Sequence, residues 1–131
     1  MKLLLIIAGV IEAVAGLALL LIPTVAVSML LGDPLDTSTG LVAARIAGAA
    51  LVALAIACWQ ARNGERGSPA TGVVQAMLFY NFAAIAVLVY AGIRLQLDSV
   101  LLWPAIVLHV ALGAWCLLNL WITRRKLSRS E

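Results

Sequence analysis

Four long apolar segments, separated by short polar connectors, constrain this chain more than any other feature of its sequence. They cover about residues 3–31, 41–61, 70–93 and 100–122. A helix needs roughly 20 mostly apolar residues to cross the hydrocarbon core of a bilayer, and each segment meets that length. The composition agrees, because 64% of the 131 residues are hydrophobic and only 11% are charged, unlike the balance of a soluble domain. The sequence predicts an all-α membrane protein.

The arrangement of these spans follows from the solvent and from the connectors. Lipid cannot supply hydrogen bonds to the edge of an open sheet, so the spans are expected to be helices. Short connectors predict one domain, residues 1–131, folded as an antiparallel four-transmembrane-helix bundle. Pro23 is expected to kink the first span or to end its membrane part near Ile22. Because Glu12 interrupts the apolar run and no A-x-A site follows it, we expect this span to be retained rather than cleaved as a signal peptide.

Two connectors carry local signals for helix starts. Residues 32–40, "GDPLDTSTG", contain an Asp-Pro turn pair, and Ser38 and Thr39 are expected to cap the second span. Residues 62–69, "RNGERGSP", end on Pro69. Proline is favoured at the first position of a helix, so the third span should begin there.

The basic residues of the loops predict the orientation, because Lys and Arg favour the cytoplasmic side of short loops. Lys2, Arg62, Arg66 and four residues of the tail lie on one side, against Arg94 alone on the other. Seven against one predicts that both termini are cytoplasmic. The expected location is the inner membrane of a bacterial cell, with the chain crossing it four times.

The chain ends in a basic cytoplasmic tail, residues 123–131, which we interpret as a topology signal. It is too short, and too poor in aromatic residues, for a nucleic-acid surface. Trp59, Trp103 and Trp121 lie at span ends, where membrane proteins concentrate aromatic side chains.

Four polar residues lie deep within the spans, where a charge costs at least about 2.5–3.5 kcal/mol. They are Glu12, Arg45, Asn81 and His109. With a rise of about 1.5 Å per residue, Glu12 lies about 13 Å above the inner end of its span. Asn81 and His109 lie about 16 Å up, and Arg45 about 22 Å up with a flexible side chain. Three helices therefore place polar groups at one level.

The helical faces predict that these groups converge. Glu12 shares a stripe with Gly9 and Gly16, and Arg45 shares one with Gly48. Small residues let helices approach closely in membranes, so these faces should point into the bundle. A Glu12–Arg45 ion pair or a Glu12–His109 hydrogen bond is the expected contact. The small residues that we expect at helix contacts are Gly9, Gly16, Ala44, Gly48 and Gly113.

Each polar residue also has a purely structural interpretation. Glu12 could fix helix register as a paired carboxylate, and Arg45 could extend to the outer interface. Asn81 is expected to form a helix-to-helix hydrogen bond. His109 is expected to be neutral and hydrogen-bonded, with a proton relay or a head-group contact as the functional alternative.

Three further residues are expected near this cluster, namely Tyr80, Cys116 and Asn119. Cys58 and Cys116 lie in apolar runs without metal-ligand spacing, so we expect neither a disulfide nor a metal site. His109 has no second histidine to join it, which excludes bis-histidine haem ligation within this chain, and no cofactor is expected.

Several stretches resemble a family of small bacterial four-span membrane proteins that is distantly similar to DoxX-like proteins. They are "ARIAGAALVALAIACWQAR", "AMLFYNFAAIAVLVYAGI", "LLWPAIVLHVALG" and "GLALLLIPTVAVSMLLG". The resemblance implies residence in a bacterial inner membrane and no particular reaction. It also implies importance for the residues in the motif cores, which are Arg45, Tyr80, Asn81, Trp103, Pro104 and His109.

Function is the least constrained property of this sequence. The favoured hypothesis is a binding or accessory protein that holds a lipid, a quinone or a protein partner at the polar cluster. The alternatives are an assembly subunit of a membrane complex and a small proton-coupled transporter, in which Arg45 and His109 would weaken the attraction of Glu12 for a cation. A second copy of the chain is a further candidate partner, and nucleic acid is not. No catalytic residue is predicted, because no nucleophile is paired with an activating base.

Overall fold

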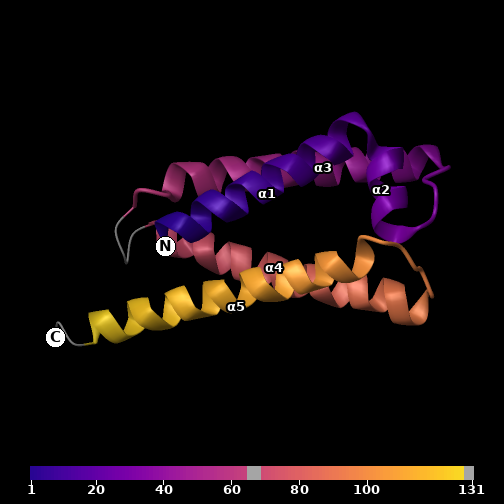
Figure 1. The fold of residues 1–131 in the computed structure, drawn as a ribbon. Helices are drawn as coiled ribbons and strands as arrows, with labels where there is room; N and C mark the ends of the chain where they lie inside the picture. The colour runs from indigo at the N-terminus through magenta and orange to yellow at the C-terminus, as the bar shows by residue number, and fades with distance from the viewer. Residues whose placement is uncertain (65–68, 129–131) are drawn as a thin grey trace.

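The structure of this chain is a computed structural model that describes residues 1–64 and 69–128 (Figure 1). Arg66 and Arg129, two of the basic residues that predict the orientation, lie outside the described residues. The described part forms five helices, which are α1 (Lys2–Leu21), α2 (Pro23–Leu31), α3 (Ser38–Ala61), α4 (Pro69–Arg94) and α5 (Leu102–Leu127).

Within the described part, four of these helices, α1, α3, α4 and α5, are long and apolar enough to cross a membrane. The predicted all-α class is therefore confirmed for the described residues, and four helices have the length and apolar composition that the four predicted spans require. The apolar helices indicate a multi-pass membrane protein.

Pro23 separates the first two helices. The helix α1 ends at Leu21, and Pro23 is the first residue of α2. Between them, Ile22 has φ −131° and ψ 54°, which is not a helical conformation. Proline has no N–H and its ring clashes with the preceding helical turn, but it is tolerated at the start of a helix. The predicted break at this position is confirmed.

The starts of α3 and α4 test the two connector predictions. Pro69 is the first residue of α4, as predicted. The cap of α3 is Thr37, whose Oγ1 accepts a hydrogen bond from the Gly40 N–H at 3.1 Å. The prediction that Ser38 and Thr39 cap this helix is wrong. A capping residue keeps an extended backbone, as Thr37 does with φ −98° and ψ 140°, whereas Ser38 and Thr39 already lie inside the helix.

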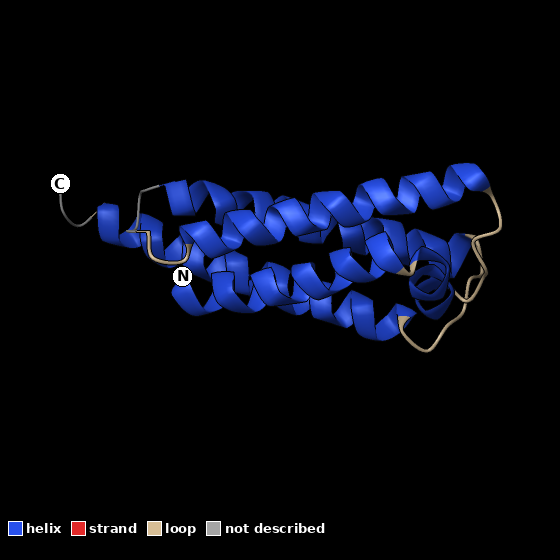
Figure 2. Cartoon of the chain, turned by 90° about the horizontal axis from the view of Figure 1, so that it is seen from above, coloured by secondary structure: helices blue, strands red, loops and turns tan. Residues whose placement is uncertain are grey.

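The long helices form two hairpins, α1 with α3 and α4 with α5 (Figures 1 and 2). Both views show the helices side by side, with the two chain ends at one end of the molecule. The first hairpin is packed most closely at Gly16 and Gly48. A Cβ atom built on either glycine would lie 2.7 Å from the carbonyl oxygen of the other. The predicted contact between these small residues is confirmed, because only hydrogen fits between the two backbones.

The two hairpins meet through an apolar core near the chain ends. The side chains of this core come from α1, α3, α4 and α5, and both cysteines of the chain lie among them as free thiols. Its buried residues are Leu4, Leu5, Ala8, Cys58, Ala70, Val74, Met77, Leu112 and Cys116.

At the opposite end, α2 packs against the second hairpin. Leu30 and Leu31 contact a smaller core formed by Leu88, Leu102 and Ile106. The Ser99 hydroxyl, from the connector before α5, donates a hydrogen bond of 2.6 Å to the Leu30 carbonyl oxygen. The hairpins are thus joined by large side chains at one end and by α2 at the other, with a space between the two contacts.

The contact between Gly16 and Gly48 gives a first testable prediction. Substitution of Gly16 by alanine should destabilise the fold by about 1–3 kcal/mol, because the added methyl group meets backbone atoms that cannot move aside easily. Thermal unfolding in detergent micelles measures this loss.

Gly72 of α4 provides the matched control. A Cβ atom at Gly72 has no heavy atom within 4 Å, so Gly72→Ala should leave the Tm unchanged or raise it slightly, as expected from helix propensity. Equal Tm values for Gly16→Ala and Gly72→Ala would contradict the close approach of α1 and α3.

Candidate functional site

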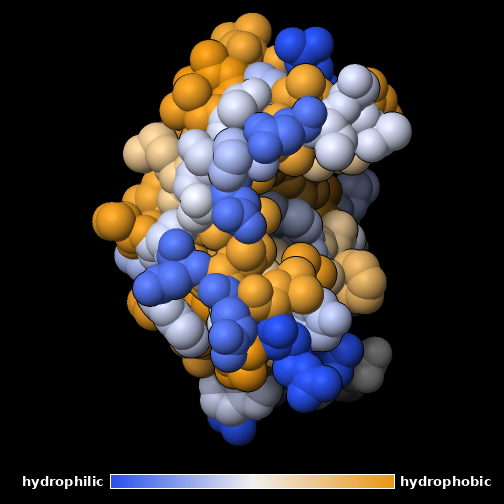
Figure 3. All heavy atoms as spheres, turned by 90° about the vertical axis from the view of Figure 1, so that its right-hand side faces the viewer, coloured by the Kyte–Doolittle hydropathy of each residue, from blue (hydrophilic) through white to orange (hydrophobic). Residues whose placement is uncertain are grey.

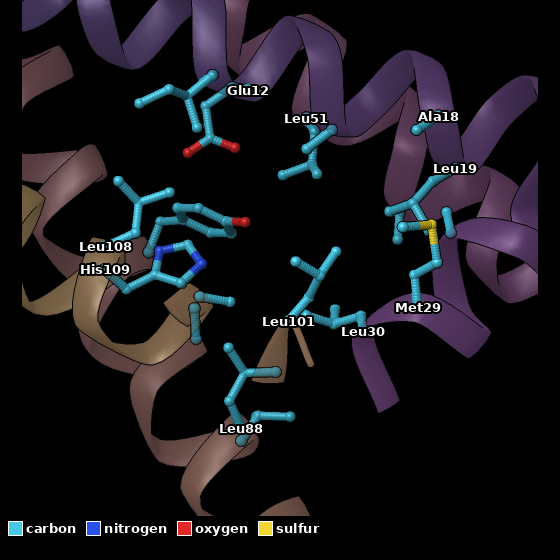
Figure 4. Close-up of a pocket in the computed structure, with 18 of the residues that line it drawn as sticks. Glu12, Ala18, Leu19, Met29, Leu30, Leu51, Leu88, Leu101, Leu108 and His109 are labelled. Atoms are coloured by element: carbon cyan, nitrogen blue, oxygen red, sulfur yellow. The ribbon is translucent and has the colours of Figure 1, made fainter. Parts of the chain in front are cut away.

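A cavity of about 710 Å³ lies between the two hairpins, and we call it the chamber (Figure 4). Its volume is in the range of roughly 300–1,000 Å³ that is typical of small-molecule sites. All five helices contribute to its walls, which are almost entirely aliphatic. The polar side chains among its described lining residues are Glu12, Tyr80 and His109.

Glu12 of α1 is the most unusual group in the chamber. Its side chain is 1% exposed, and Figure 4 shows its carboxyl group directed toward the second hairpin. The phenol of Tyr80, across the boundary between the hairpins, is the polar side chain that interacts with this carboxyl group. The Oε1 atom is nevertheless buried with no hydrogen-bond partner within normal bonding distance. A buried carboxyl oxygen without a partner is costly, so this atom is a candidate contact for a group that donates a hydrogen bond.

Asn81 and His109 form a contrasting pair, joined to each other by a hydrogen bond. The Asn81 amide nitrogen donates to the Met77 carbonyl oxygen at 2.7 Å. Its Oδ1 atom lies 2.9 Å from Nδ1 of His109, which links α4 to α5 as predicted for Asn81. Asn81 is completely buried.

This pair assigns the tautomer of His109. Because the amide nitrogen of Asn81 is committed to a carbonyl, the atom facing the imidazole is an acceptor, and Nδ1 of a neutral His109 must carry the hydrogen. The Nε2 atom then has a free lone pair. Figure 4 shows this edge of the imidazole directed into the chamber. His109 therefore presents a hydrogen-bond acceptor to the space.

Tyr80 interacts with both of the other described polar residues that line the chamber, Glu12 and His109. Its ring meets the His109 ring edge to face, with centroids 5.6 Å apart and planes at 78°. Its hydroxyl group is the partner of Glu12. The sequence predicted only that Tyr80 lies near the cluster, since an aromatic residue in a span gives no signal of which neighbours it joins.

Neither contact predicted for Glu12 is formed among the described residues, because Glu12 pairs with Tyr80 and His109 pairs with Asn81. Arg45 is exposed. The expectation that it faces the interior is therefore wrong. Gly48 packs against Leu19 and Leu20 at the end of α1, which ends at Leu21. Arg45, nearly one turn before Gly48 in the antiparallel α3, therefore lies beyond this contact. One of the two sequence-based reasons against a transporter is thereby removed, since Arg45 supplies no charge beside Glu12.

The remaining predicted residues lie away from the chamber. Cys116 belongs to the core near the chain ends. The Asn119 amide donates to the Trp115 carbonyl oxygen at 3.0 Å, a bond within α5. Trp103 and Pro104 are exposed in the first turn of α5, where proline is tolerated.

Comparisons with protein-family models, with curated proteins and with solved structures give no match to this chain. Among the described residues, no three metal-ligating side chains gather at one place. The similarity to DoxX-like proteins stays a prediction from the sequence.

The different environments of Glu12 and Asn81 lead to a second prediction. Glu12→Met should raise the Tm, because it replaces a buried carboxyl whose Oε1 atom lacks a partner by an apolar side chain of similar length. Asn81→Leu should destabilise the fold by about 1–3 kcal/mol, since the His109 Nδ1–H loses its acceptor.

Thermal unfolding of both variants in the same detergent tests this contrast. A loss of stability in Glu12→Met as large as that in Asn81→Leu would show that the carboxyl group is satisfied in the folded protein, contrary to its unpartnered oxygen.

Proposed function

We propose that this chain is an integral membrane protein that binds a lipid or a quinone in the chamber. The apolar part of the ligand lies against the aliphatic walls, and its polar head meets Glu12 and His109. The observation that carries the proposal is the buried Oε1 atom of Glu12, which has no partner and borders an apolar space. A mostly apolar pocket with a few convergent polar groups is the usual form of such a site.

The same observation favours binding over a purely structural role. A cluster that only fixes helix register is most stable when every polar group in it is paired. Asn81 and the Nδ1 atom of His109 are paired in this way, whereas the Oε1 atom of Glu12 is not.

Access to the chamber is proposed to come from the lipid phase. Met29 of α2, Val87 of α4 and Leu108 of α5 line the chamber and are also exposed on the surface of the chain. In a membrane, an apolar surface of this kind faces acyl chains. A lipid or quinone therefore reaches the chamber sideways, without leaving the bilayer.

The proposed setting is a bacterial inner membrane, crossed by an antiparallel bundle with both termini in the cytoplasm. Exposed Asp33, Asp36 and Asp98 lie at the end of the molecule that carries α2, where Figure 3 shows hydrophilic residues among apolar ones. At the end that carries the termini, Arg62 stacks on Trp59 and Arg125 on Trp121, at 4.0 and 3.5 Å from the ring centroids. Cations and aromatic rings of this kind suit a cytoplasmic interface.

The orientation can be measured by labelling two introduced cysteines in intact cells with a membrane-impermeant maleimide. Asp36→Cys should react from outside, and Ser128→Cys only after the membrane is permeabilised. The native Cys58 and Cys116 are 0% exposed and provide an unreactive background. Labelling in the opposite order would reverse the orientation.

Filling the chamber tests the binding site itself. Ala84 lines the chamber, and Ala84→Phe should displace the ligand by occupying its volume. Native mass spectrometry of protein purified in a mild detergent should find a bound lipid or quinone in the wild type and little or none in Ala84→Phe.

Ala86, two residues further along α4, is exposed and does not line the chamber. Ala86→Phe adds the same ring outside the site and should keep the bound molecule. A wild-type protein that carries no lipid or quinone, or an Ala84→Phe variant that still carries one, would contradict the proposed site.

A further inference from the structure

The chamber presents hydrogen-bond acceptors that lack donors. The Oε1 atom of Glu12 is buried and unpartnered. The Nε2 atom of His109 is the free acceptor of an imidazole whose Nδ1–H is held by Asn81. Figure 4 shows the carboxyl group of Glu12 and the imidazole of His109 on the same side of the chamber, directed toward its interior.

The donors available within the chamber do not match these acceptors. Among the described lining residues, Tyr80 supplies one hydroxyl donor, which interacts with Glu12, against the two acceptors. The other described lining residues besides Glu12 and His109 are aliphatic or methionine. A ligand head that brought only acceptors would face Oε1 and Nε2 without a hydrogen bond to either, and buried acceptors without donors are unfavourable.

We propose that the ligand of the chamber is an amphiphile whose head group donates hydrogen bonds, so that a quinol binds in preference to the corresponding quinone. This inference rests on the proposed function and adds the chemistry of the head group to it. A quinol carries two hydroxyl groups, whereas the quinone carries two carbonyl groups that only accept. Binding involves no electron transfer, and the chain is assigned no redox step.

The protonation of Glu12 does not remove the preference. A protonated carboxyl group supplies one donor, but it leaves an acceptor oxygen, and Nε2 of a neutral His109 remains an acceptor. Both states therefore retain an acceptor for which a hydroxyl group is a partner and a carbonyl group is not.

The same donor chemistry is found in other membrane amphiphiles, such as long-chain alcohols. Two matched pairs of probes separate these sources. Decyl-hydroquinone and decyl-quinone have the same tail and differ in the head, and so do dodecanol and dodecyl methyl ether. Tighter binding of the hydroxyl-bearing probe in both pairs indicates a general site for hydroxyl head groups. Tighter binding of the hydroquinone in the first pair alone indicates a site for a quinol ring.

The experiment measures the Kd of each probe with the purified full chain in lipid nanodiscs, under anaerobic conditions for the quinol. The hydroquinone should bind at least about tenfold more tightly than the quinone, which corresponds to the loss of one hydrogen bond. In Glu12→Gln the amide group adds a donor beside its oxygen, so binding of the quinone should improve and the preference should shrink. Arg45→Gln removes a charge outside the chamber, so the ratio of the Kd values for the quinone and the hydroquinone should stay as in the wild type.

Each outcome bears on a defined part of the inference. Equal binding of the hydroquinone and the quinone to the wild type, or tighter binding of the quinone, overturns the head-group assignment and leaves amphiphile binding intact. An unchanged ratio in a folded Glu12→Gln also overturns it. If none of the four probes binds, and native mass spectrometry finds no lipid or quinone, the proposed function itself fails. If Glu12→Gln does not fold, the ratio of the two Kd values in the wild type alone tests the preference for the quinol.

Discussion

The backbone contact between α1 and α3 determines how the rest of the molecule is built. Because Gly16 and Gly48 leave no room for side chains between them, the two helices are fixed in rotation relative to each other. At about 100° per residue, Glu12 lies about 40° from Gly16 around α1 and about 60° from Ala15, which lines the chamber. The carboxyl group is therefore turned from the glycine contact toward the second hairpin. A different helix contact would carry Glu12 to the lipid or into α3.

The two hairpins show how polar groups can be distributed within one apolar protein. In the second hairpin, Asn81 bonds to His109 and to a backbone carbonyl, and the α4–α5 pair gains a specific contact. In the first hairpin, Glu12 interacts with Tyr80 and has one buried oxygen without a hydrogen-bond partner. Natural proteins tolerate unsatisfied groups mainly at functional sites. The asymmetry therefore separates a structural pair from a group that is available to a ligand.

The features that the sequence predicts correctly are those that a single residue or a short window determines. Length and hydropathy define four spans, Pro23 and Pro69 mark helix boundaries through their missing N–H, and glycines mark the closest helix contact. Arg45 was misplaced because a stripe shared with Gly48 does not show how far the helix contact extends, and α1 ends at Leu21, beside Gly48 and before the level of Arg45. The chamber could not be predicted, since it depends on how two hairpins fit together and no residue pattern encodes an empty volume.

The polar groups around the chamber come from both hairpins, so cleavage of the chain between the hairpins would separate them. A break between α3 and α4 would leave the acid on one fragment and the phenol, the amide and the imidazole on the other. Each fragment would keep its internal helix contacts, but neither would contain all the residues that line the chamber. Complementation between the two halves would restore the chamber only when the two hairpins pack together, so the proposed site exists only in the assembled chain.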